Sequence, residues 1–161
     1  MAFWLIGEAP NPPTVGHPDL WLLPDGSGLP HTANRLLALT GWSLEQYLQV
    51  FDHRTNLWNS PANVWIYNGR RRAEKIVSES AADGSLGVVV LGTKAAHAFG
   101  FEDVEPLTWY DRFALVPHPS GRCRFWGSPD NRAAARFFFD GVMERALGAP
   151  GQGGRPKRGT G

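Results

Sequence analysis

Apolar and polar positions follow two different rhythms along this chain, and they predict short strands separated by helices. Short apolar runs typical of buried strands occupy residues 3–7, 86–91 and 113–116, and residues 51–58 form a further candidate strand. Helical spacing or capping residues predict helices over 33–39, 44–49, 70–82, 94–99 and 128–147. This alternation favours an α/β fold with a short, mostly parallel central sheet that helices cover on both faces.

Length and composition indicate one globular domain followed by a tail. The chain has 161 residues, of which 42% are hydrophobic and 19% charged, so it can bury a substantial core. We expect the domain to cover residues 1–147. Residues 148–161 are rich in glycine, proline and basic side chains, and this composition predicts a flexible basic tail.

Several classes of protein are disfavoured by what the sequence lacks. The single cysteine, Cys123, excludes a disulfide framework, an iron–sulfur cluster and a cysteine-based zinc site within one chain. The five histidines show no metal-ligand spacing, and no glycine-rich motif for a nucleotide cofactor is present. No apolar run reaches the length of a membrane span, and the N-terminal run lacks the basic start of a signal peptide. We therefore expect a cytoplasmic monomer without a metal, a cofactor or a membrane partner.

Charge is distributed unevenly, although the formal net charge is only +1. Residues 1–111 carry a net charge of −5 and residues 112–161 a net charge of +6. Such an asymmetric chain can steer an anionic partner such as DNA. The basic tail is equally consistent with a solvated segment that has no partner.

Two polar loops follow predicted strands and are candidates for the walls of one pocket. The first is Gly7-Glu8-Ala9-Pro10-Asn11-Pro12-Pro13-Thr14, and the second begins Pro117-His118-Pro119-Ser120-Gly121. In open parallel sheets, ligands bind beyond the carboxyl ends of the strands, where both loops would lie. A structural turn for the first loop and a structural histidine for the second are the plainer interpretations.

The order of these loops and of three motifs between them resembles the uracil-DNA glycosylase superfamily. The first loop is similar to the Gly-Glu-Ala-Pro-Gly motif of its family four branch, with Asn11 in place of the last glycine, and the second to the His-Pro-Ser motif. The three intervening matches are Asn34-Arg35-Leu36-Leu37, Arg54-Thr55-Asn56-Leu57 and the Leu-Gly-x-x-Ala-Ala step at residues 91–96. The resemblance covers residues 3–145 and implies a three-layer α/β/α glycosylase-like fold.

This resemblance implies a monofunctional DNA glycosylase that extrudes a nucleotide and hydrolyses its N-glycosidic bond, leaving an abasic site. His118 would donate a hydrogen bond to the departing base anion, and Asn11 or Glu8 would position the attacking water. Asn56 offers a donor and an acceptor on one amide, which suits reading a base edge. A turn asparagine is the alternative interpretation of Asn56.

The segment after His118 corresponds to the loop that the family inserts into the duplex. The expected DNA-binding residues are Ser120, Gly121, Arg122, Arg124 and Phe125. The arginines would hold phosphates, and Phe125 or Trp126 would fill the gap left by the extruded base. Core packing is the alternative for these two aromatic residues.

Departures from the family pattern point to an altered base pocket. Ala9 stands where other branches carry Asp or Asn, the second carboxylate of the first motif is missing, and residues 29–31 lack the stacking Phe or Tyr. His31 and Ala9 are therefore expected to border a wider base-binding cavity. An uncommon pyrimidine, such as the glucosylated hydroxymethylcytosine of phage DNA, fits these departures better than uracil and suggests anti-phage defence.

Three other functions stay open at this stage. A repair-type uracil-DNA glycosylase is one, and a non-catalytic DNA- or base-binding protein on the same fold is another, because the missing carboxylate would suit it. An N-glycosidase for free nucleotides, or another small-molecule enzyme on a Rossmann-like sheet, is a third, although the basic C-terminal third disfavours it.

Overall fold

The computed structural model describes residues 2–8, 31–58, 65–120 and 123–148 of the chain. Its elements, in chain order, are β1 (Phe3–Gly7), α1 (His31–Thr40), α2 (Leu44–Val50), β2 (Phe51–Asn56), α3 (Trp65–Ala82), β3 (Gly87–Leu91), α4 (Thr93–Ala98), β4 (Trp109–Tyr110), β5 (Phe113–Val116), a 3-10 helix (Arg124–Gly127) and α5 (Pro129–Leu147). This composition confirms the predicted α/β class.

The described strands form one mostly parallel sheet with the order β2-β1-β3-β5-β4. Strands β2, β1, β3 and β5 are parallel to one another. Strand β4 lies at one edge of the sheet and pairs with β5 in the antiparallel direction. Every residue of β1 and β3 is buried, as expected of central strands that helices cover on both faces. Strand β2 is outermost on the other side, and its middle residues Asp52 to Thr55 are exposed or half-buried.

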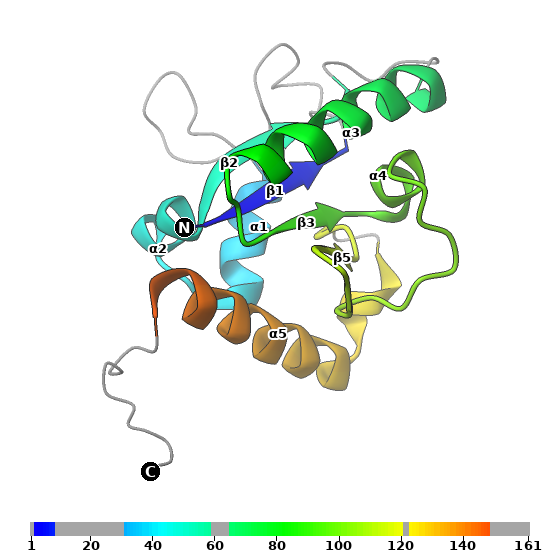
Figure 1. Ribbon diagram of the computed structural model, residues 1–161. Coiled ribbons are helices and arrows are strands. Elements are labelled where there is room, and N and C mark those ends of the chain that lie inside the picture. Colours follow the sequence, from blue (N-terminus) through cyan, green and yellow to red (C-terminus); the bar gives the residue numbers. More distant parts are fainter. Residues whose placement is uncertain (1, 9–30, 59–64, 121–122, 149–161) are drawn as a thin grey trace.

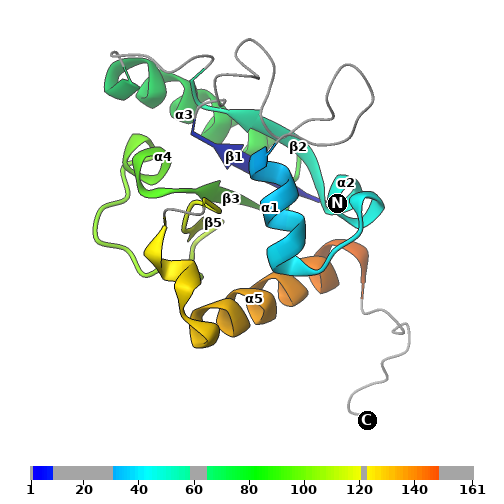
Figure 2. The ribbon, with the colours of Figure 1, turned by 180° about the vertical axis from the view of Figure 1, so that it is seen from behind.

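Helices pack against both faces of this sheet, as Figures 1 and 2 show from opposite sides. On one face, Phe3 and Leu5 of β1 join an apolar cluster with residues of α1, α2 and α5. On the other face, Trp4 and Ile6 pack with Ala73 and Ile76 of α3 and with Ala95 and Ala96 of α4. The alternation of β1 side chains between the two clusters follows from the two-residue period of a strand.

Local capping signals explain where two helices begin. The Ser43 side chain accepts a hydrogen bond from the Gln46 backbone amide, and the Gln46 side chain accepts one from the Ser43 amide, which completes a capping box for α2. At the start of α5, the Ser128 side chain accepts a hydrogen bond from the Asn131 backbone amide, and Pro129 occupies the first helical position.

Helix α3 and strand β4 differ most from the sequence-based expectation, and the bounds of the other predicted elements shift by at most two residues. Helix α3 begins at Trp65 rather than near residue 70. The two-residue strand β4, which was not predicted, lies at one edge of the sheet. Within the loop expected to insert into DNA, residues Arg124–Gly127 form a 3-10 helix.

Candidate functional site

Four parallel strands end at one edge of the sheet and bring predicted site residues to that edge. Asn56 ends β2 and pairs with Gly7, the last residue of β1, while Leu91 at the end of β3 pairs with Val116 of β5. Glu8 directly follows β1, and His118 lies two residues after the end of β5. Since β1 and β3 lie between β2 and β5, the strands that lead to Asn56 and to the His118 loop are three interstrand spacings apart, about 14 Å.

Glu8 extends the pairing of β1 with β2 and joins β1 to α4. Its backbone carbonyl accepts a hydrogen bond from the Trp58 amide at 3.0 Å. Its carboxylate accepts hydrogen bonds from the backbone amides of Lys94 and Ala95, in the first turn of α4. Burial raises the pKa of Glu8, and the positive charge of Lys94 and these two hydrogen bonds oppose that rise.

Gly92 makes this contact possible. It lies between β3 and α4 with φ +95°, a conformation that side-chain-bearing residues rarely adopt. A Cβ atom at this position would lie 2.2 Å from Glu8 Oε2. The Leu-Gly-x-x-Ala-Ala step therefore contains a glycine because the Glu8 carboxylate lies against its Cα, a contact that the sequence analysis did not foresee.

Asn56 is almost fully buried at the end of β2, with 5% of its surface exposed. Its side-chain Nδ2 is also buried and has no hydrogen-bond partner among the described residues. A buried amide donor without a partner is costly, so Nδ2 has a hydrogen bond to donate to any water or ligand that reaches it.

His118 is half-buried in the loop after β5, and this loop is held from two sides. The His118 carbonyl accepts hydrogen bonds from Trp126 Nε1 at 2.9 Å and from the Ser120 amide at 2.7 Å. Arg35 of α1 donates from Nε to the Pro119 carbonyl at 2.9 Å. Burial lowers the pKa of His118, which favours the neutral imidazole.

The expected DNA-binding residues that the structure describes have different surroundings. Arg124 is exposed, whereas Phe125 is half-buried and lies edge-to-face on the ring of the buried Trp126, with ring centroids 4.9 Å apart. Trp126 thus has a structural role, and Ser120 is half-buried beside His118.

The remaining predicted residues are not placed by the structure. Ala9, Asn11, Gly121 and Arg122 lie outside the described residues. His31 is the first residue of α1, but its side chain lies outside the described part of the structure.

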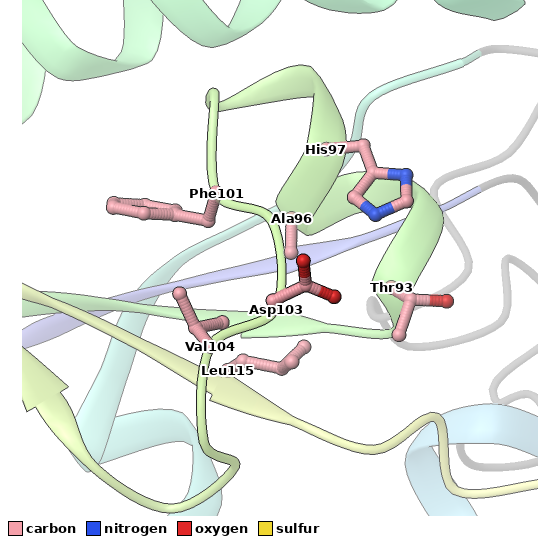
Figure 3. A pocket seen from close by; sticks show the side chains of 7 residues that line it. All are labelled: Thr93, Ala96, His97, Phe101, Asp103, Val104 and Leu115. Atoms are coloured by element: carbon pink, nitrogen blue, oxygen red, sulfur yellow. The ribbon is translucent and has the colours of Figure 1, made fainter.

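A separate cavity of about 310 Å³ lies between α4, β5 and the segment after α4 (Figure 3). Its lining combines an apolar floor with three polar side chains, from Thr93, His97 and Asp103. None of the predicted site residues that the structure describes lines it. The sequence carries no signal for this cavity.

Comparison with known proteins returns no matching protein family, no matching curated protein and no matching solved structure. In the described part of the chain, no helix is both long and apolar enough to cross a membrane. The same residues contain no group of three or more His, Cys, Asp or Glu side chains placed to hold a metal ion.

Proposed function

We propose that this protein is a monofunctional DNA glycosylase with a three-layer α/β/α glycosylase-like fold. It would hydrolyse the N-glycosidic bond of an uncommon pyrimidine and leave an abasic site. The pyrimidine is either a modified phage base, such as glucosylated hydroxymethylcytosine, or uracil. The observation that carries this proposal is the buried Nδ2 of Asn56, which has no hydrogen-bond partner among the described residues and lies at the same end of the sheet as the loop of His118.

The two residues divide the recognition of an extruded nucleotide between them. Asn56 reads the base edge, since its Nδ2 has a hydrogen bond still to donate. His118 donates a hydrogen bond to an oxygen of the departing base, and a half-buried neutral imidazole is able to do so. Water adds to the sugar carbon as the base leaves with the bonding electron pair. One proton of the water stays on the new hydroxyl group of the sugar, and the other passes to a side chain or to solvent.

Glu8 and Asn11 are the candidates for orienting that water. An ionised carboxylate has about four acceptor positions, and the α4 amides occupy two of those on Glu8. The remaining positions are sufficient to hold a water molecule, and Asn11, three residues later in the same loop, is the alternative.

Base release from defined DNAs tests the proposal. The protein is incubated with uracil-containing duplex, with glucosylated phage DNA and with unmodified DNA, and the released base is identified by mass spectrometry. We expect release from glucosylated DNA. Release from uracil DNA alone would exclude the modified-base substrate and the defence role and leave a repair-type enzyme.

The His118→Ala variant connects any activity to this site. Removing one such hydrogen-bond donor typically lowers kcat by about 10²- to 10³-fold, and we expect a loss of that order with DNA binding retained. Unchanged turnover in His118→Ala would refute the assignment.

A non-catalytic DNA- or base-binding protein is the second candidate. It is favoured by the engagement of the Glu8 carboxylate with α4, together with Ala9 at a position where other branches carry Asp or Asn. This function predicts retention of DNA without formation of abasic sites in the same assays.

A further inference from the structure

The inner face of α3 lies against the end of β2, where Asn56 is located. Gly69 and Arg72 are one helical turn apart and therefore share this face. Arg72 Nη2 donates a hydrogen bond to the Asn56 backbone carbonyl at 3.1 Å and approaches Thr55 Oγ1 at 3.4 Å. A single guanidinium nitrogen thus contacts two consecutive residues of β2.

Gly69 allows the same face of α3 to contact Trp58, two residues after Asn56. A Cβ atom at Gly69 would lie 2.5 Å from Cζ2 of Trp58, so the indole packs directly on the backbone of α3. Trp58 is 4% exposed, and its amide donates to the Glu8 carbonyl. The segment from Thr55 to Trp58 is therefore held by α3 on one side and by β1 on the other.

The side chain of Asn56 contributes little to its own placement through Nδ2. That atom is buried without a partner among the described residues, and the same holds for Arg72 Nε. The direction of the amide therefore depends on the packing around this buried side chain and on how firmly the backbone of residue 56 is fixed. Two side chains donate hydrogen bonds to the Asn56 backbone carbonyl, Arg72 through Nη2 at 3.1 Å and the neighbouring Thr55 through Oγ1 at 3.3 Å, and of these only Arg72 comes from another element.

We propose that Arg72 is a positioning residue, which holds Asn56 so that its amide meets the edge of the bound base. This inference rests on the proposed function, because it assigns to Asn56 the reading of that base. Arginine suits the task, since its planar guanidinium bonds neighbouring acceptors in a fixed geometry. A lysine would supply one flexible ammonium, and a glutamine no charge.

Binding to DNA with and without the base separates positioning from folding. Affinities are measured in a His118→Ala background for duplexes that carry uracil, glucosylated hydroxymethylcytosine or an abasic site at one position. We expect Arg72→Gln to weaken binding to the recognised base about tenfold and to leave binding to the abasic duplex unchanged. Arg72→Lys should restore part of the loss.

Arg70→Gln is the matched control, because it removes the same charge from an exposed position of the same helix. It should not change the ratio of affinities for the base-containing and the abasic duplex. An equal loss on both duplexes for Arg72→Gln would overturn the proposal in favour of a purely structural role.

The side-chain amide signals of Asn56 provide a readout that needs no activity. In nitrogen-15 spectra, Arg72→Gln should shift or broaden these signals, and Arg70→Gln should leave them in place. If the wild type neither releases nor distinguishes any of the tested bases, the proposed function fails, while a shift still shows that Arg72 places Asn56. Unmoved Asn56 signals in folded Arg72→Gln would overturn the positioning role.

Discussion

His118 combines partial burial with a backbone that two other elements hold. Trp126 Nε1 and the Ser120 amide both donate to its carbonyl, and Arg35 donates to the carbonyl of the next residue. The imidazole thus extends from a fixed loop rather than from a freely moving one. For a hydrogen-bond donor that acts on a developing charge, fixed placement of the donor matters more than the strength of the same hydrogen bond in water.

The lowered pKa of His118 gives a prediction about pH. Because burial lowers the folded-state pKa of His118 below its ordinary value of 6.5, the unfolded chain binds the proton more readily. The contribution of neutral His118 to stability is complete above pH 6.5 and is lost as the pH falls through the lowered folded-state pKa. Denaturant unfolding of the wild type and His118→Gln at several pH values measures this contribution.

The wild type should lose more stability than His118→Gln when the solution is acidified below pH 6.5. Parallel stability curves for the two proteins would contradict the buried, neutral imidazole. Base release should decline over the same acidic range only if the neutral form is the active one, so the two profiles are best recorded together.

Among the elements, the junction of β3 and α4 depends on the missing side chain of Gly92. Its positive φ and the closeness of Glu8 Oε2 both oppose a larger residue. The Glu8 carboxylate in turn holds the first amides of α4, so one glycine connects the end of β1 to the start of a helix.

Gly92→Ala should therefore destabilise the fold by about 1–3 kcal/mol, through strained backbone and displacement of the Glu8 carboxylate. Chemical denaturation measures the loss. Gly100→Ala is the matched control, because Gly100 also has a positive φ, +90°, but no atom lies within 4 Å of a Cβ built there. A loss no larger than that of the control would show that the Glu8 contact contributes nothing.

The sequence predicted elements whose signals are local. Strands β1 and β5 begin and end where expected, because apolar runs are bounded there by Glu8 and Pro117. Ser43 and Ser128 marked the starts of α2 and α5 through ordinary capping chemistry. Strand β4 escaped prediction because two residues, Trp109 and Tyr110, carry too little pattern to identify a strand.

Local sequence signals do not predict the contacts that shape the candidate site. Glu8, Asn56 and His118 were predicted to be near strand ends, and the sheet topology places them at one edge. The hydrogen bonds from Arg35 to Pro119 and from Arg72 to Asn56 join residues 84 and 16 positions apart. Such pairs depend on how helices cross the sheet, which periodicity does not encode.

For the whole molecule, the proposed function requires DNA to reach the sheet edge that carries Asn56 and His118. The charge asymmetry of the chain places a net +6 in residues 112–161, which follow β4 and include the His118 loop. Arg124 is an exposed cation of this region in the described part of the chain. Its placement suits contact with a phosphate rather than with a base.

DNA affinity should consequently fall with rising salt, and Arg124→Ala should reduce the slope of log K against log salt by about one. Fluorescence anisotropy with unmodified duplex at several salt concentrations provides the slope. Lys75→Ala serves as the control, because Lys75 is paired with Glu79 along α3. An unchanged slope for Arg124→Ala would remove this residue from the DNA interface.

Strand β2 has a consequence for solubility. An outermost strand exposes backbone groups that can template the addition of another chain, and a continuous apolar edge invites aggregation. Here the edge carries Asp52, His53 and Arg54, charged or polar side chains at exposed or half-buried positions. The strand that ends in the buried amide of Asn56 is therefore also the one whose polar middle protects the sheet from edge-to-edge assembly, so apolar replacements there should reduce solubility before they affect the fold.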